Sequence, residues 1–466
     1  MALELRDKRV LIVGLGQSGL AAARFVKSKG ARVTVSDSKT LEELKDQIPR
    51  LLDEGMAVET GRHRERTFEN QDLIVVSPGV PLEGLPLPPS SREKVIGEIE
   101  LAAQFIPGPI FAITGSNGKT TTTTLAGEVV KNGGFPTLVG GNIGTPAISL
   151  VEEAAEDTVV VLEVSSFQLE TIRTFRPRIA VVLNITPDHL DRHGTFAAYR
   201  DAKARIFENQ QANDFAVLNA DDPSSVELRS RTRAQVFWFS RKQVPDRGAY
   251  VAEGRVFFRN ASSQREIMPL SDISLPGAHN LENVLAAACV GVLADVEPGR
   301  IRKAVREFRA VEHRLEYVAS LRGVAYYNDS KATNVDATIK ALESFPANVR
   351  LILGGKDKAS DYRQLNDLLR ERVKSVYTIG AAAEKIESQI QGTEVVHAET
   401  LENAIRRAAA AAESGDVVLL APACASFDQF RNYEHRGKVF KEVVRSLVAE
   451  AEAESSQAKE RTNQVN

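Results

Sequence analysis

Short apolar runs alternate along the chain with stretches in which apolar residues recur every three or four positions. The runs at 9–13, 32–36, 158–164 and 179–185 are rich in Val, Ile and Leu, as is typical of strands buried on both faces of a parallel sheet. The stretches between them have the spacing of crossover helices. The pattern therefore predicts an α/β fold with parallel sheets.

This pattern recurs in three blocks, and a Pro-rich segment at about 85–91 separates the first block from the second. A chain of 466 residues is also long enough for roughly three domains of about 150 residues each. We expect domains over 1–93, 94–309 and 310–450, followed by a small, polar and frayed tail over 451–466.

The second block contains three local signals. Alternation around Glu253 and Gly254 predicts a β-hairpin over 249–258. The turn Pro276-Gly277 precedes a predicted helix over 279–293, and another helix is predicted over 196–209.

Charge and composition exclude several classes of function. The chain has 59 Lys and Arg against 62 Asp and Glu, so it lacks the basic footprint of a nucleic-acid or membrane-surface binder. Its first residues carry charges where a signal peptide needs an apolar core, and no apolar run approaches the ~20 residues of a membrane span. Cys289 and Cys424 lack metal-ligand spacing. We expect a cytoplasmic protein with reduced thiols and small-molecule substrates.

The strongest chemical signal is the segment 114–120, Thr-Gly-Ser-Asn-Gly-Lys-Thr, which lies between an apolar strand and a helix. Backbone N–H groups at such a helix start bind phosphate, the lysine adds charge, and the threonine hydroxyl reaches Mg²⁺. The loop is shorter than the common form, because Ile113 stands where that form has its first glycine. An ordinary capped turn is the alternative, but Gly-Lys-Thr at this boundary favours a nucleotide triphosphate.

A second glycine-rich turn, Gly14-Leu15-Gly16-Gln17-Ser18-Gly19, follows the first strand and opens a helix, and Asp37 closes the next strand. This is the dinucleotide-binding pattern. The turn binds a pyrophosphate and the carboxylate binds ribose hydroxyls, so a nucleotide sugar fits as well as NAD does. Tight packing alone is the third interpretation. Since no hydride-transfer site is evident nearby, we favour a nucleotide diphosphate.

Two residues that follow central strands are candidate Mg²⁺ ligands. Glu163 ends the run 158–164, and His189 follows the run 179–185. Ligands of open α/β sheets bind beyond the carboxyl ends of the strands. A helix-capping or ion-paired glutamate and a surface histidine are the alternatives. His193 is a weaker candidate of the same type.

Lys203 is unusual because it projects from the apolar face that Tyr199, Ile206 and Phe207 form on the predicted helix. Such a lysine usually extends outward to water. Alternatively, a desolvated neutral amine could react with CO₂ to form a carbamate, which would act as a carboxylate-like metal ligand.

With these motifs together, the chain resembles the Mur ligase family, the ATP-dependent amino-acid ligases of bacterial cell-wall synthesis. The segments that carry the resemblance are 114–120, 141–144, Glu163, 184–189, 199–203 and 279–283. The short phosphate loop is the family's own form. Segments 163–169, 328–334 and 422–430 are most similar to the branch that adds D-glutamate to UDP-N-acetylmuramoyl-L-alanine. The resemblance spans about 5–448.

The resemblance implies a Rossmann-like nucleotide-sugar domain, a central P-loop ATPase-like domain and a Rossmann-like C-terminal domain. It also implies that ATP phosphorylates the L-alanyl carboxylate and that the amine of D-glutamate attacks the resulting acyl phosphate. The implied cofactors are two Mg²⁺ ions, with ATP as co-substrate and a carbamate on Lys203. The protein would act as a monomer without a nucleic-acid or membrane partner, and its third domain would close over the centre.

The resemblance also implies site residues. The UDP substrate would contact Leu15, Gln17, Ser18, Asp37, Ser38, Ser77, Gly79, Asn142 and His189. ATP would contact Gly115, Ser116, Asn117, Gly118, Lys119, Thr120, Thr121, Asn283, Arg314 and Asp329. The metal ligands would be Thr120, Glu163, His189 and carbamylated Lys203. D-glutamate would contact Lys331, Thr333, Lys356, Ser426 and Tyr433. The catalytic residues would be Lys119, His189 and Lys203.

Three other functions remain open from the sequence. The first is a related ligase, either a folylpolyglutamate synthase or a Mur ligase for another amino acid; the first glycine-rich turn disfavours the folate branch. A nicotinamide oxidoreductase would leave Lys119, Glu163, Lys203 and Lys331 without a role. A nucleotide-gated binding protein would leave the metal and acyl-transfer candidates without a role.

Overall fold

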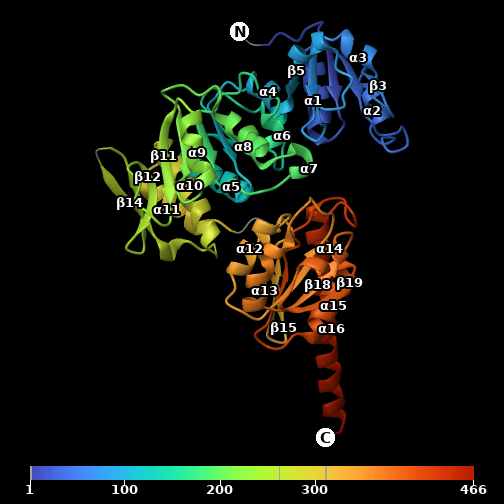
Figure 1. The fold of residues 1–466 in the computed structure, drawn as a ribbon, viewed down its shortest axis with the longest axis vertical. Coiled ribbons are helices and arrows are strands. Elements are labelled where there is room, and N and C mark those ends of the chain that lie inside the picture. The colour runs from blue at the N-terminus through green and yellow to red at the C-terminus, as the bar shows by residue number, and fades with distance from the viewer. Residues whose placement is uncertain (1–2, 262, 276, 310–311, 466) are drawn as a thin grey trace. The chain divides into compact units, whose positions relative to one another are not determined.

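The structure is a computed structural model that describes residues 3–261, 263–275, 277–309 and 312–465 (Figure 1). Pro276 of the predicted turn and Ala310 at a predicted domain boundary lie outside the described residues. The chain divides into two compact units. Unit 1 comprises Met1–Ile185, Arg192–Ser274 and Glu282–Phe308, and unit 2 comprises Thr186–Asp191, Leu275–Leu281 and Arg309–Asn466.

The first sheet of unit 1 has five parallel strands in the order β3-β2-β1-β4-β5. They are β1 (Arg9–Val13), β2 (Arg32–Ser36), β3 (Ala57–Glu59), β4 (Leu73–Val76) and β5 (Val95–Gly97). The helices of this region are α1 (Gln17–Ser28), α2 (Ile48–Asp53) and α3 (Glu65–Glu69). The predicted strands 9–13 and 32–36 are confirmed.

A nine-stranded sheet forms the rest of the core of unit 1, in the order β14-β13-β12-β11-β10-β9-β6-β8-β7. Its parallel part comprises β6 (Ile110–Thr114), β7 (Thr137–Gly141), β8 (Val159–Glu163), β9 (Ile179–Val182), β10 (Phe215–Asn219), β11 (Gln235–Ser240) and β12 (Gly248–Ala252), and the antiparallel strands are β13 (Arg255–Arg259) and β14 (Gln264–Pro269). The main helices are α4 (Glu98–Ala103), α5 (Lys119–Asn132), α8 (Phe196–Ala204), α10 (Ala278–Leu293) and α11 (Pro298–Glu307). Shorter helical segments are α6 (Ser166–Leu169), α7 (Leu190–His193), α9 (Pro223–Glu227) and η2 (Ala147–Leu150).

The predicted hairpin is confirmed, since β12 and β13 pair in antiparallel fashion and join through Glu253 and Gly254. Both turn residues have positive φ, 50° and 71°, as the tight turn between two strands requires. The predicted strand 179–185 is shorter than expected and ends at Val182, because the backbone carbonyl of Asn184 turns to accept the N–H of Ser116.

The predicted helix 196–209 is wrong at its end. α8 stops at Ala204 and the chain continues as a 3₁₀ turn over Arg205–Phe207. The N–H of Glu208 bonds to the carbonyl of Arg205, which is the tighter spacing common in last helical turns. The predicted apolar face of this segment is confirmed. Its members are all buried, and they are Tyr199, Lys203, Ile206 and Phe207.

Unit 2 contains a six-stranded sheet in the order β15-β16-β20-β17-β18-β19, with β15 antiparallel to its neighbour. Its strands are β15 (Glu316–Leu321), β16 (Val324–Asn328), β17 (Val349–Gly354), β18 (Val373–Ile379), β19 (Glu394–Glu399) and β20 (Val417–Leu420). Its helices are α12 (Val335–Glu343), α13 (Asn366–Arg372), α14 (Ala383–Gln389), α15 (Leu401–Ala411) and α16 (Tyr433–Val465). Apolar clusters cover the sheet and include Leu353 and Leu419 in one and Ile352 and Leu420 in the other.

The expectation of a frayed tail over 451–466 is wrong, because α16 continues to Val465. The segment contains no Gly or Pro and is rich in Ala, Glu, Gln, Lys and Arg, all of which favour helix. A membrane span would need a longer or more apolar helix than any found among the described residues.

Candidate active site

The phosphate loop lies between β6 and α5, as the sequence predicts. Gly118 has φ of +83°, and a Cβ there would come within 2.2 Å of Asn283 Oδ1. Asn283 Oδ1 also accepts a hydrogen bond of 3.2 Å from Thr122 Oγ1 of α5. The fold therefore brings Asn283, a predicted ATP residue on α10, against the loop.

Two further interactions define the loop. The side-chain oxygen of Asn184 accepts the N–H of Asn117 at 2.9 Å, so the chain after β9 holds the loop in place. Lys119 Nζ donates to the carbonyls of Gly115 at 2.9 Å and Ser116 at 2.8 Å. Its ammonium group consequently lies over the same loop whose N–H groups are expected to receive phosphate.

The predicted metal ligands Thr120 and Glu163 are in direct contact. Thr120 Oγ1 donates to Glu163 Oε2 at 2.7 Å, and Asn142 Nδ2 donates to the other carboxylate oxygen at 2.8 Å. Parallel pairing of β6 with β8 sets Ile113 beside Glu163. Glu163 is only 1 % exposed. A buried carboxylate with an adjacent hydroxyl is a hard oxygen donor set that suits Mg²⁺.

Lys203 points into the protein, not outward to water. Lys203 is only 1 % exposed, and its Nζ donates to the carbonyl of Gly115 at 2.8 Å. The Tyr199 ring centroid lies 4.6 Å from Nζ, and the Tyr199 hydroxyl shares a hydrogen bond of 3.1 Å with Ser116 Oγ. Lys203 and Lys119 thus meet at one loop carbonyl.

The two histidines have different surroundings. In unit 2, His189 has φ of +53° and its N–H donates to Asp188 Oδ1 at 2.9 Å. In unit 1, His193 Nε2 lies 3.0 Å from Ser166 Oγ, and its ring packs against Tyr199. The role of His189 as a metal ligand stays a prediction.

The glycine-rich turn after β1 is braced by two predicted substrate residues. Asp37 Oδ2 accepts the N–H of Leu15 at 2.6 Å, and Ser77 Oγ donates to the carbonyl of Gly14 at 2.9 Å. A Cβ at Gly19 would lie 1.9 Å from the Gly14 carbonyl oxygen, so this turn requires glycine. The other predicted UDP residues here lie in the first turn of α1 or after β2 and β4, and are Ser18, Ser38 and Gly79.

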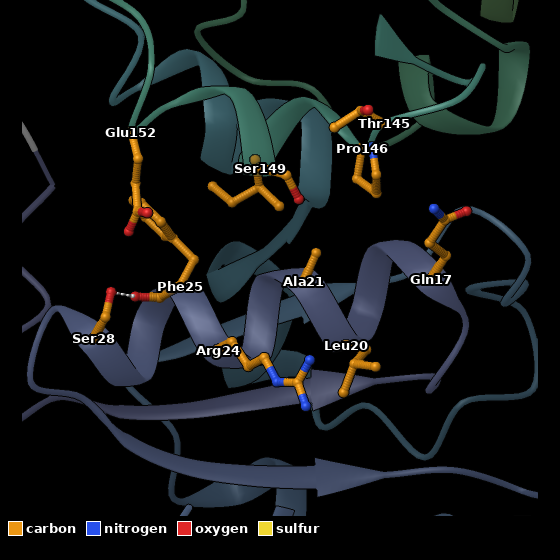
Figure 2. A pocket seen from close by; sticks show the side chains of 11 residues that line it. Gln17, Leu20, Ala21, Arg24, Phe25, Ser28, Thr145, Pro146, Ser149 and Glu152 are labelled. Carbon is orange, nitrogen blue, oxygen red and sulfur yellow. Dashed lines mark hydrogen bonds between the residues drawn. The ribbon is translucent and has the colours of Figure 1, made fainter. Parts of the chain in front are cut away.

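Gln17 links the first turn of α1 to the segment after β7. Its side-chain Nε2 donates to the carbonyl of Gly144 at 3.3 Å. Beside this contact is a cavity of about 550 Å³, with Leu20 and Phe25 of α1 on one wall and Pro146 on the other (Figure 2). Gln17 therefore faces a hollow between α1 and the segment around η2.

In unit 2, the fold pairs Lys331 with Tyr433. Lys331 Nζ donates to the Tyr433 hydroxyl at 2.7 Å and lies 4.0 Å from the ring centroid. Thr333 follows two residues later and is half-buried. Of these three predicted D-glutamate residues, two lie in the loop between β16 and α12 and Tyr433 is the first residue of α16.

The other two predicted D-glutamate residues are also neighbours. The backbones of Lys356 and Ala425 exchange hydrogen bonds of 2.8 and 3.0 Å, which places Lys356 beside Ser426. The fully buried Arg436 joins both pairs, because its guanidinium donates to the carbonyls of Ser330 and Cys424. Burial lowers the pKa of Arg436 to about 10.

Lys358 has no predicted role, since plain surface charge is the alternative interpretation of both Lys356 and Lys358. The Lys356 side chain is exposed, whereas that of Lys358 is 13 % exposed and forms an ion pair of 3.2 Å with Asp188. Asp188 also accepts a hydrogen bond of 3.0 Å from Asn334. Both lysines follow the same glycine pair, so sequence alone gave no signal for which one turns inward.

Arg314 and Asp329 form the last predicted ATP contacts. Burial raises the pKa of Asp329 to about 7, against the opposing effect of the Arg314 guanidinium. The Nε atom of Arg314 is buried and has no hydrogen-bond partner among the described residues. Since an unpaired buried donor is costly, this atom is suited to an acceptor on a bound ligand.

Comparison with known families identifies the class of protein. Three family profiles match in order: "Mur ligase MurD-like, N-terminal domain" over 8–94, "Mur ligase middle domain" over 113–291, and "Mur ligase, glutamate ligase domain" over 313–424. The chain belongs to the Mur ligase family, and the expected α/β fold of parallel-sheet domains is confirmed.

Two relatives are similar over nearly their whole length and are both named UDP-N-acetylmuramoylalanine--D-glutamate ligase. The protein of Koribacter versatilis is 64 % identical, over 96 % of this chain and 99 % of the relative. That of Acidobacterium capsulatum is 56 % identical, over 95 % and 97 %.

Solved structures show the same fold at lower identity. A pseudomurein peptide ligase type C from Methanothermus fervidus has a TM-score of 0.61 at 21 % identity, covering 95 % of this chain and all of that one. The UDP-N-acetylmuramate-alanine ligase of Thermotoga maritima has a TM-score of 0.58 at 18 % identity, covering 94 % and all of that chain.

Proposed function

We propose that this chain joins D-glutamate to UDP-N-acetylmuramoyl-L-alanine in a reaction driven by ATP, as a step of peptidoglycan precursor synthesis. It is a carboxylate–amine ligase that forms a peptide bond and releases ADP and phosphate. The observation that carries the proposal is the cluster at the ends of β6 and β8, where a phosphate loop, a buried carboxylate and a buried lysine are in contact. Its relatives' common name supplies the substrates.

The residue types suit the chemistry. A carboxylate must gain a leaving group before an amine can displace it, and phosphorylation by ATP gives an acyl phosphate. Such transfer depends mainly on positioning and on neutralising phosphate charge. Lys119 and the loop N–H groups perform that task here, and Asn283 and Arg314 hold the rest of the nucleotide.

A family of this kind uses ATP with Mg²⁺, and the donor set of Thr120 and Glu163 fits that ion. Magnesium supplies charge neutralisation at the transferred phosphate. Our proposal adds His189 and a carbamate on Lys203 as ligands, and two ions in total. Burial of the Lys203 amine supports the carbamate, because desolvation works against the charged form of a lysine and a carbamate forms on the neutral amine.

The carbamate has a direct test. In protein equilibrated with ¹³C-bicarbonate, we expect a carbamate carbon signal in the NMR spectrum that is lost in Lys203→Ala. Lys119→Ala is the matched control, because it removes a second lysine from the same loop carbonyl and should keep the signal. Loss of the signal in both variants, or its absence from the wild type, would refute the carbamate.

We also propose a division of labour among three domains. Residues 1–93 present the nucleotide sugar, 94–309 bind ATP, and 310–450 bind D-glutamate. The three separate sheets and the order of the family descriptions support a division into three domains, although the first sheet extends beyond residue 93 to include β5. In the third domain, Lys331, Thr333, Ser426 and Tyr433 contact D-glutamate, and the inward Lys358 takes part in addition to Lys356. The protein acts in the cytoplasm as a monomer on small molecules.

The decisive experiment measures phosphate release from ATP with UDP-N-acetylmuramoyl-L-alanine and with D-glutamate, L-glutamate or no acceptor. We expect release that requires both the nucleotide sugar and D-glutamate. Release with a different amino acid would keep the family and overturn the assignment of the acceptor. ATP binding without release under any condition would overturn the reaction itself.

A further inference from the structure

A second cavity of unit 1 lies at the end of the nine-stranded sheet where its central parallel strands begin, opposite the end that carries the phosphate loop. Its volume is about 600 Å³. Pro109, Val159, Ile179 and Phe215 line it, and each stands at or just before the first residue of a parallel strand. The candidate active site lies at the last residues of three of these strands, so the two sites occupy opposite ends of the same strands.

Two helices connect these ends as well. α5 begins at Lys119 of the phosphate loop and ends at Asn132, shortly before Phe135, which lines the cavity. α10 carries Asn283 near its start, and its final residues Val292 and Leu293 line the cavity. The carboxyl end of a helix carries partial negative charge, so α10 favours a cation in this cavity.

Five aromatic rings form part of the wall of the cavity. The lining rings belong to Phe111, Phe135, Phe215, Phe237 and Phe258. The Phe237 centroid lies 5.8 Å from the centroids of Phe215 and Phe258, and Phe135 is 37 % exposed. The Arg178 guanidinium already sits 5.0 Å from the Phe215 centroid, which shows that this wall accepts a cation on a ring face.

The charged residues that line the mouth of the cavity, its rim, also favour a cation. Glu156, Asp157 and Asp295 line the cavity and are exposed, and none forms an ion pair with another described residue. Of the two lining arginines, Arg178 forms an ion pair of 3.3 Å with Asp214, a carboxylate that Arg176 also binds at 2.7 Å. The lining therefore has three carboxylates against two arginines, a balance that favours a cation over an anion.

We propose that this cavity binds an amphipathic organic cation, a protonated amine attached to an apolar or aromatic body. The aromatic wall buries the body, and the rim carboxylates with the end of α10 hold the ammonium group. The site is separate from the ligase reaction and lies at the far end of the elements that carry Lys119 and Asn283.

Calorimetric titration with 4-phenylbutylamine tests the proposal, with 4-phenylbutan-1-ol and 4-phenylbutyrate as neutral and anionic probes of the same body. For a ligand of this size we expect a Kd on the order of 1 mM for the amine. The alcohol should bind about threefold or more weakly, and the acid more weakly still. Equal affinity for all three probes, or no binding of the amine, would overturn the proposal.

Variants locate the site. The double variant Asp157→Asn with Asp295→Asn should weaken the amine about threefold to tenfold and leave the alcohol unchanged. Phe135→Ala should weaken both probes. Asp46→Asn is the matched control, because it removes an exposed carboxylate outside the cavity and should change neither. An equal effect of Asp46→Asn and the double variant would refute a local site.

Discussion

Two threonines on α5 have hydroxyl groups in opposite situations, although both residues are buried. Thr120 Oγ1 donates to Glu163, whereas Thr123 Oγ1 is buried with no hydrogen-bond partner among the described residues. Replacing an unpaired buried hydroxyl by a methyl group of the same shape removes a desolvation cost. We expect Thr123→Val to raise the free energy of unfolding by about 1 kcal/mol, measured by urea denaturation.

The matched variant Thr120→Val should affect activity, whereas Thr123→Val should affect stability. It removes a proposed Mg²⁺ ligand and the partner of Glu163, so we expect kcat/KM to fall by about 100-fold or more, equivalent to about 3 kcal/mol of transition-state stabilisation. Thr123→Val should leave kcat/KM unchanged. If both variants retain wild-type kinetics, the proposed role of the Thr120 hydroxyl is refuted.

At the scale of elements, α4 carries two buried carboxylates with opposite pKa shifts. Burial raises the pKa of Glu98 to about 7, although its Oε1 accepts the N–H of Ile148 in η2 at 2.8 Å. Burial also acts on Glu100, but hydrogen bonds from Arg173, Thr174 and Gln104 outweigh it and lower the pKa. α4 is thus fastened to two separate segments of the central domain.

These shifts predict opposite pH dependences. Native Glu98 holds its proton more tightly than the unfolded chain does, so its contribution to stability is present below pH of about 4.5 and is lost as pH rises to about 7. Glu98→Gln should therefore raise the free energy of unfolding at pH 8 by about 1–3 kcal/mol and have little effect near pH 4.

Glu100→Gln is the control for this experiment. Its lowered native pKa makes the ionised form stabilising above the unfolded value, so the variant should be less stable than wild type at pH 8. Urea unfolding at both pH values checks the pair. Stabilisation by both variants at pH 8, or by neither, would contradict the assignment.

At the scale of the whole molecule, the chain passes between the two units at several points, and the short segments Thr186–Asp191 and Leu275–Leu281 cluster with unit 2. We propose that the third domain closes over bound ATP and nucleotide sugar, because an acyl phosphate must be kept from water. Small-angle X-ray scattering should show a smaller radius of gyration on adding a non-hydrolysable ATP analogue with UDP-N-acetylmuramoyl-L-alanine.

Lys119→Ala serves as the control for closure, since it weakens the hold on the nucleotide phosphates without altering the unit boundaries. We expect little compaction in this variant. An unchanged radius of gyration in the wild type at saturating ligand would count against closure.

The amino-acid sequence was sufficient to predict the α/β class, the strands at 9–13 and 32–36, the hairpin at Glu253 and the position of the loop 114–120 between a strand and a helix. The physical reason is that each depends on local features: apolar runs, turn residues that accept positive φ, and glycines followed by lysine at a strand end. Two predictions of helix boundaries were wrong: α8 ends at Ala204 and not at residue 209, and α16 continues through the tail. The end of a helix depends on small differences in propensity and spacing, which a local sequence pattern does not resolve.

Which side chains turn inward became clear from the folded molecule alone. The Lys358 side chain is only 13 % exposed whereas Lys356 is exposed, and both follow the same glycine pair in the sequence. The apolar helix face marked Lys203 as unusual, but the pattern left open whether its amine turns outward, and the structure buries it. Lys203 is buried because Tyr199 and the carbonyl of Gly115 surround its amine, and Lys358 because Asp188 pairs with it. The direction of a side chain follows from partners that lie far along the chain, and those partners meet only in the folded molecule.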